Sequence, residues 1–251
     1  MPTTGRHAGK CCVAPPPDVY ESVGQEVADI CGVPAYISGS PSSRAAVLFI
    51  CDIYGWKVPQ TRRLADKVAS AGFFVVLPDF MNDDFFQSPD PDNPYEGLDA
   101  YLARHSQEDA IEVASKIIDE LGKRGFKQIG VAGFCWGGKI TVSLINGTSK
   151  ADAAVMLHPS FLVVEEIQAV RKPLAILGAE IDEITPPELA MKFGNLLEKI
   201  PEMEGKSIVK IFRGADHGFS TRYDPHDMDA VRRAMEAHDD MLNWFTKYLQ
   251  L

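Results

Sequence analysis

The chain has 251 residues, a net charge of −10 and a pI near 5.1. This length suits one domain whose core is large enough to fold without disulfide bonds or a structural metal. The acidic balance argues against nucleic-acid and anionic-membrane partners, because both need a basic surface. The longest apolar stretches are as long as strands and fall well short of the ~20 residues that a membrane span requires.

The first 24 residues are expected to form an arm, because consecutive prolines at 15–17 rule out regular helix and internal strand. No apolar core followed by a small-residue cleavage site is visible there, so we expect a cytoplasmic protein. The cysteine count is odd and fits no zinc pattern, so we expect reduced thiols, no metal and no bridge between Cys11 and Cys12. Residues 25–251 are then expected to form the folded domain.

From residue 25 onward, strand-like and helix-like segments alternate. The predicted strands are a hairpin within 27–37, followed by 45–50, 73–77, 127–132, 153–157, 173–177 and 207–212. The predicted helices are 61–71, 108–121, 139–146, 187–200 and 228–248, with Thr185 as the N-cap of the fourth. The segment 80–103 is rich in Asp, Pro and Asn and is expected to be a long surface excursion.

This alternation predicts an α/β fold of the α/β-hydrolase type, with a mostly parallel central sheet and helices on both faces. In open sheets of this kind, ligands bind beyond the carboxyl ends of the strands. The residues that directly follow each strand are therefore the candidates for chemistry.

The strand over 127–132 is followed by Gly-Phe-Cys-Trp-Gly-Gly at 133–138. This is the Gly-x-nucleophile-x-Gly elbow, with Cys135 in place of the more common serine. Small residues are needed on both sides because the nucleophile occupies a sharp turn between strand and helix. The alternative is a glycine-rich turn that carries a buried structural cysteine.

Two further strand ends supply an acid and a base. Asp182 follows the strand over 173–177 and is the expected triad acid, with Glu180 and Glu183 as competitors. His217 follows the strand over 207–212, between an aspartate and a glycine, and is the expected general base. The chain order of nucleophile, acid and histidine matches that of the α/β-hydrolases.

The other histidines are given less chemical roles. His7, His105 and His238 are expected at exposed positions, and His226 is expected to be solvated at the start of the last helix. His158 follows the strand over 153–157, so it either lines the pocket or is a hydrogen-bonded structural histidine.

The loop after the strand over 45–50 is expected to complete the site. The backbone N–H groups of Ile53 and Trp136 are the predicted oxyanion donors. Asp52 either faces the same cleft or caps the following turn, and Tyr54 is a candidate pocket wall.

Taken together, these motifs resemble the dienelactone hydrolase (carboxymethylenebutenolidase) family, and most closely its plant and fungal branch. The shared motifs are an N-terminal Cys-Cys…Pro-Pro, Ser-Gly-Ser-Pro at 38–41, Gly-Phe-Cys-Trp-Gly at 133–137, His-Pro-Ser-Phe at 158–161, Leu-Gly-Ala-Glu-Ile-Asp at 177–182 and the closing segment 237–245. The resemblance implies a monomeric enzyme without a cofactor, with Cys135 as nucleophile, Asp182 as acid and His217 as base. Some plant members carry the name endo-1,3;1,4-β-D-glucanase.

The sequence departs from the bacterial members of that family at two places. There a glutamate after the first buried strand contacts the resting cysteine, and here that position is Asp52. Bacterial members hold a substrate carboxylate with two arginines, whereas here only Arg222, five residues after His217, is available.

We therefore expect a hydrolase that cleaves a lactone or small carboxylic ester through a thioester on the cysteine. One alternative is a glycan hydrolase, which would need a pair of carboxylates across a sugar-binding cleft. Another is a non-catalytic ligand-binding protein on a hydrolase scaffold.

Overall fold

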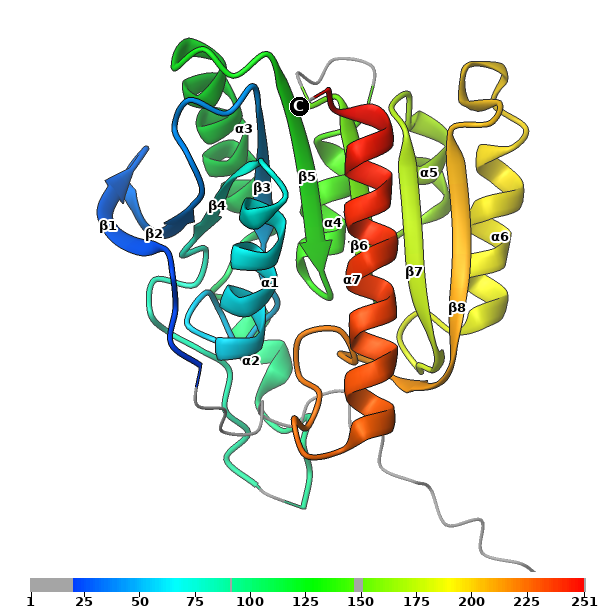
Figure 1. Cartoon of the computed structure of the whole chain (residues 1–251). Helices are drawn as coiled ribbons and strands as arrows, with labels where there is room; N and C mark the ends of the chain where they lie inside the picture. The colour runs from blue at the N-terminus through cyan, green and yellow to red at the C-terminus, as the bar shows by residue number, and fades with distance from the viewer. Residues whose placement is uncertain (1–19, 91, 147–150, 251) are drawn as a thin grey trace, which may run out of the picture.

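The computed structural model describes residues 20–90, 92–146 and 151–250, and within them it contains one eight-stranded sheet covered by helices (Figure 1). The order across the sheet is β1-β2-β4-β3-β5-β6-β7-β8. The strands are β1 (Gln25–Ile30), β2 (Val33–Ser38), β3 (Ala45–Ile50), β4 (Phe74–Pro78), β5 (Gln128–Phe134), β6 (Ala153–Leu157), β7 (Leu174–Ile181) and β8 (Ser207–Asp216).

The strands from β4 across to β8 are parallel, whereas β1 and β2 form an antiparallel hairpin at one edge. After β3 the chain turns to β4 on one side, and it later returns to β5 on the other side. The loops that leave β3 and β5 therefore diverge, and the carboxyl ends of these two strands form a topological switch point, where sheets of this kind bind ligands.

Helices cover both faces of the sheet, as the sequence predicts. Helices α1 and α7 lie on one face and α3, α4, α5 and α6 on the other, while α2 lies beyond the edge toward which the parallel strands point (Figure 1). The bounds are α1 (Pro59–Ser70), α2 (Leu98–Leu102), α3 (Gln107–Lys123), α4 (Gly137–Ser143), α5 (Val164–Ala169), α6 (Pro187–Leu197) and α7 (Met228–Tyr248), with a 3₁₀ turn at Pro201–Met203. Within the described ranges, no helix has the length and apolar character that crossing a bilayer demands.

The core lies between the sheet and these two helical layers. All residues of β3, β4 and β6 are buried, as expected of parallel strands covered on both faces. On β5, Gly130 allows α7 to approach closely, because a β-carbon there would lie 2.7 Å from the Phe245 ring and 2.8 Å from Leu249. The side chains at the end of α7 thus pack against β5 at the place where Gly130 has no side chain.

Two strands extend further than the sequence predicts. The predictions ended at residues 177 and 212, but β7 continues to Ile181 and β8 continues to Asp216. The apolar pattern breaks at Gly178 and Glu180, although the backbone pairing continues through a register shift between Ala179 and Ile181. Asp182 therefore follows its strand directly, with no intervening loop.

Other differences concern helix ends. Helix α4 begins and ends earlier than the predicted 139–146, and α5 was not predicted. The residue at the N-cap of α6 is Pro186 and not Thr185, which instead is buried and donates its backbone N–H to Asp182.

Most of the expected N-terminal arm, with Cys11 and Cys12, lies outside the described residues. Its last residues are held against the domain by the buried carboxylate of Asp66 on α1. That carboxylate accepts hydrogen bonds from the Tyr20 hydroxyl at 2.9 Å, from the Val23 N–H at 3.0 Å and from the Tyr36 hydroxyl at 2.7 Å. The boundary between arm and domain at residue 24 stays a prediction.

Candidate active site

The predicted elbow lies at the switch point, directly after β5. Cys135 has a φ of +51°, a left-handed conformation that a non-glycine residue adopts only under local constraint. A β-carbon on Gly133 would lie 2.2 Å from the Thr141 hydroxyl, and one on Gly137 would lie 2.1 Å from the carbonyl oxygen of Ile50. The two glycines therefore allow the turn to pack against α4 and against the end of β3.

The structure joins Asp182 to His217 at the neighbouring strand ends. His217 Nδ1 and Asp182 Oδ2 are 2.7 Å apart, and both side chains are almost fully buried. The other carboxylate oxygen, Oδ1, accepts the backbone N–H groups of Ile184 at 2.9 Å and Thr185 at 3.0 Å. Because an ionised carboxylate only accepts, Nδ1 of the imidazole carries the hydrogen and Nε2 is free to act as a base.

The competing acids lie elsewhere. Glu180 is exposed and its carboxylate accepts the backbone N–H of Gly214 at 2.7 Å, while Glu183 is exposed. Of the three acids named by the sequence, Asp182 is the one whose carboxylate contacts the His217 ring.

The sequence missed a serine between the sulfur and the imidazole. Ser160 Oγ lies 3.4 Å from Cys135 Sγ and 3.5 Å from His217 Nε2, and Ser160 is fully buried. The only sequence signal was its place in the His-Pro-Ser-Phe motif, which gave the hydroxyl no role. It enters the site because β6 pairs with β5, so that the turn after β6 lies beside the elbow.

The pKa of the His217 imidazole depends on the groups on both sides of the ring. Burial lowers the pKa of His217, but the charge of Cys135 and the hydrogen bonds with Asp182 and Cys135 outweigh burial and raise the pKa to about 9. The raised pKa means that the folded site favours the protonated form of the His217 imidazole.

His158 packs against the ring of His217. It is fully buried with a φ of +39°, and its ring packs edge-on against the His217 ring at a centroid distance of 5.1 Å. Its Nε2 lies 2.9 Å from the Ser220 hydroxyl. Burial, followed by the charge of His217, lowers the pKa of His158 well below its usual value, so it stays neutral. This geometry agrees with the structural alternative for His158.

Asp52, Tyr54 and Arg222 form a second buried cluster. Asp52 Oδ1 accepts the backbone N–H of Tyr54 at 2.9 Å, so the aspartate does cap its turn, while Oδ2 lies 3.5 Å from Arg222 Nε. The guanidinium lies 4.9 Å from the centroid of the Tyr54 ring. Burial raises the pKa of Asp52, and Arg222 opposes this shift. Arg222 reaches this place because Gly218 has no side chain, since a β-carbon there would lie 2.1 Å from Nη2.

The two predicted oxyanion donors lie after neighbouring strands. Ile53 follows β3 and Trp136 follows Cys135, and the β3–β5 register pairs Ile50 with Gly133. The carbonyl oxygen of Ile53 accepts the N–H of Phe86 at 2.9 Å, and the Tyr101 hydroxyl lies 3.1 Å from it and 2.8 Å from the carbonyl oxygen of Asp84. The predicted excursion thus contacts the loop that carries Ile53, a link that no sequence pattern indicated.

Two histidines predicted to be exposed are buried. His105 Nε2 lies 2.9 Å from Asp84 Oδ2, and His238 Nε2 lies 2.7 Å from the carbonyl oxygen of Ser220. The prediction was wrong because each ring finds a specific acceptor that makes burial of a polar group tolerable. As for the remaining two, His226 is exposed as expected and His7 lies outside the described residues.

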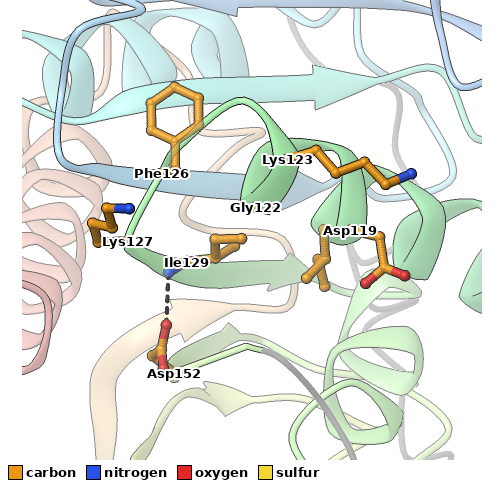
Figure 2. A pocket seen from close by; sticks show the side chains of 8 residues that line it. Asp119, Gly122, Lys123, Phe126, Lys127, Ile129 and Asp152 are labelled. Carbon is orange, nitrogen blue, oxygen red and sulfur yellow. Dashed lines mark hydrogen bonds between the residues drawn. The ribbon is translucent and has the colours of Figure 1, made fainter.

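A depression at the opposite edge of the sheet has a different character. It lies between the end of α3 and the amino ends of β5 and β6, and charges of both signs line it (Figure 2). Asp152 is already engaged there, because its Oδ2 accepts the N–H of Ile129 at 2.8 Å. Since ligands of such sheets bind at the carboxyl ends of the strands, this depression is separate from the catalytic edge.

Comparison with known proteins finds relatives that match most of the chain. A maize protein named endo-1,3;1,4-beta-D-glucanase is 36% identical over 207 residues, which span 80% of this chain and 66% of the maize protein. A Xenopus tropicalis protein named carboxymethylenebutenolidase homolog is 32% identical, and the match covers 92% of this chain and 93% of the relative. The Aspergillus violaceofuscus hydrolase pyvD is 27% identical over 96% of this chain and 97% of its own length.

Solved structures share the fold at lower identity. A Klebsiella pneumoniae protein proposed to be a dienelactone hydrolase superposes with a TM-score of 0.71 at 17% identity, over 92% of this chain and all of that one. A dienelactone hydrolase-like phosphotriesterase from metagenomic libraries gives a TM-score of 0.68 at 15% identity, over 90% of this chain and 98% of its own.

The model of one protein family matches residues 33–249, which include all nine candidate residues at the carboxyl edge of the sheet from Asp52 to Arg222. The chain therefore belongs to the dienelactone hydrolase family, and it is a hydrolase with the α/β-hydrolase fold.

Proposed function

We propose that this protein hydrolyses a small carboxylic ester or lactone with Cys135 as the nucleophile, His217 as the base and Asp182 as the acid. The observation that carries the proposal is the position of the His217 imidazole. Its Nδ1 is fixed by a buried carboxylate at 2.7 Å, and its Nε2 lies 3.5 Å from the Ser160 hydroxyl, which is 3.4 Å from the Cys135 sulfur. This is the relay that acyl transfer requires.

In the proposed reaction, the proton of the Cys135 thiol rests on His217 Nε2 and the thiolate attacks the carbonyl carbon. The N–H groups of Ile53 and Trp136 receive the oxyanion of the tetrahedral intermediate. When the intermediate collapses, the leaving alkoxide takes the proton from Nε2 and a thioester remains on the sulfur. His217 then removes a proton from water, which attacks the thioester and releases the acid.

The cluster of Asp52, Tyr54 and Arg222 bears on the choice of substrate. A substrate carboxylate would have to compete with Asp52 for the guanidinium, because Arg222 Nε already lies 3.5 Å from that carboxylate. We therefore propose that uncharged esters and lactones are turned over at least as well as anionic ones. No step of this chemistry calls for a cofactor, and the proposed enzyme acts as a monomer.

The test is hydrolysis of p-nitrophenyl acetate and of a small lactone by the wild type and by Cys135→Ala. We expect the variant to lose turnover while its thermal unfolding stays close to that of the wild type. Cys31→Ala is the matched control, because Cys31 is an exposed free thiol in the turn between β1 and β2. Turnover that persists in Cys135→Ala would sink the proposal.

The name of the maize relative suggests one further assay for the same variants. If the protein cleaved glycans, mixed-linkage glucan would release reducing ends with both the wild type and Cys135→Ala. We expect no such release, because the triad has no part in the paired-carboxylate chemistry of glycosidases. If the protein were a binding module, an electrophilic ester would label Cys135 without releasing product.

A further inference from the structure

The hydroxyl of Ser160 is placed to contact both partners of the nucleophilic pair at once. It lies 3.4 Å from Cys135 Sγ and 3.5 Å from His217 Nε2, and Ser160 is fully buried. A serine hydroxyl has one hydrogen to donate and lone pairs to accept, so it can serve the sulfur and the nitrogen together.

The backbone around Ser160 is held in an unusual conformation. His158 and Phe161, on either side, have φ values of +39° and +63°, although neither is a glycine. The Ser160 N–H donates to the carbonyl oxygen of Cys135 at 2.9 Å, which ties the turn to the elbow itself. Strained conformations of this kind persist only where the surrounding structure enforces them, and they gather at functional sites.

We propose that Ser160 is a positioning residue that stabilises the thiolate–imidazolium pair before substrate binds. Its hydroxyl donates to the negative sulfur of Cys135 and accepts from the N–H at Nε2 of protonated His217. The proton moves only from sulfur to Nε2, so the pair stays neutral overall and the serine exchanges no proton. The inference rests on the proposed function, because it assigns Cys135 as the nucleophile.

The test is the pH dependence of Cys135 alkylation by iodoacetamide, followed by mass spectrometry of the peptide that contains Cys135. In Ser160→Ala we expect alkylation to slow about tenfold on the acidic limb, as expected for loss of one hydrogen bond to a charged group. The kcat for p-nitrophenyl acetate should fall by a similar factor with little change in KM. The control is Ser143→Ala on α4, whose hydroxyl donates to the carbonyl oxygen of Lys139 in its own helix.

A second variant, Ser160→Gly, separates the hydroxyl from its volume and serves if the alanine variant fails to fold. Equal shifts in the two variants support the role of the hydroxyl. A shift that grows with the volume removed, or an unchanged alkylation profile, overturns the inference. Cys135→Ala distinguishes a failure of the Ser160 inference from a failure of the proposed function. If Cys135→Ala abolishes turnover while Ser160→Ala leaves the pH profile of alkylation unchanged, only the role of Ser160 fails. If Cys135→Ala keeps turnover, the proposed function fails as well.

Discussion

Replacing Asp182 with asparagine tests whether the carboxylate sets the tautomer of His217. In the wild type, Asp182 Oδ1 accepts two backbone N–H groups, at 2.9 Å from Ile184 and 3.0 Å from Thr185. In Asp182→Asn, the amide oxygen must keep those two donors, because an amide NH₂ cannot accept them. The NH₂ group then faces His217 Nδ1 and forces that nitrogen to accept, which places the hydrogen on Nε2.

An imidazole with its hydrogen on Nε2 cannot take the proton from the thiol. The contact is 2.7 Å long and the two side chains are 1% and 0% exposed, so water cannot take the place of the lost acceptor. The same substitution in a serine protease triad lowers kcat by about 10⁴. That factor corresponds to about 5.5 kcal/mol of transition-state stabilisation. We expect a loss of kcat of about 10³–10⁴ here, with a small change in KM.

The assay is steady-state hydrolysis of p-nitrophenyl acetate, together with NMR titration of the His217 ring. Glu183→Gln is the matched control, because Glu183 is an exposed acid next to Asp182 and should leave kcat unchanged. The pKa of His217 should also fall in Asp182→Asn, because the hydrogen bond with Asp182 helps to raise it to about 9. If kcat of Asp182→Asn stayed within tenfold of the wild type, the tautomer argument would be refuted.

Three further outcomes are expected. Because the pKa of His217 rises from 6.5 to about 9 on folding, the protonated ring stabilises the protein below pH 6.5, and this contribution disappears as the pH rises through 9. The urea midpoint of unfolding should therefore fall between pH 6.5 and 9 in the wild type but not in His217→Gln. If the midpoints of both proteins changed with pH in the same way, the prediction would be contradicted. Tyr101→Phe removes a buried hydroxyl that lies 2.8 Å from the carbonyl oxygen of Asp84 and 3.1 Å from that of Ile53, so the free energy of unfolding should fall by about 1–2 kcal/mol and kcat should drop. An unchanged kcat would mean that the loop with Ile53 needs no such support. Gly218→Ala places a β-carbon 2.1 Å from Arg222 at a φ of +87°, so urea unfolding should show a loss of about 1–2 kcal/mol or more, and an unaltered midpoint would rule out the tight contact.

The candidate site residues could be picked out from the sequence because their signals are local. Cys135 lies in an elbow whose glycines mark it, and His217 lies in a loop that directly follows a strand. The proposed acid had to be chosen among three acids within four residues, and the contact between Asp182 and His217 became visible only in the fold. The alternation of buried strands and helices similarly predicted the α/β architecture, because parallel strands covered on both faces are apolar throughout.

What the sequence could not predict depends on which strands become neighbours. Ser160 meets the thiol only because β6 pairs with β5, and nothing within residues 158–161 signals that pairing. The burial of His105 and His238 likewise depends on acceptors that come from distant segments. The last residues of β7 and β8 were not predicted as strand because backbone pairing continues there after the apolar pattern has stopped.

Within the excursion after β4, Phe86 and Tyr101 hydrogen-bond to the carbonyl oxygen of Ile53. The residues between them make neither of these two bonds. Insertions or deletions between these two residues would therefore leave both hydrogen bonds to the Ile53 carbonyl in place. Under the proposed function, the N–H of Ile53 would keep its orientation while the length of the excursion changes, so a designer would alter loop length there before changing any residue at the strand ends.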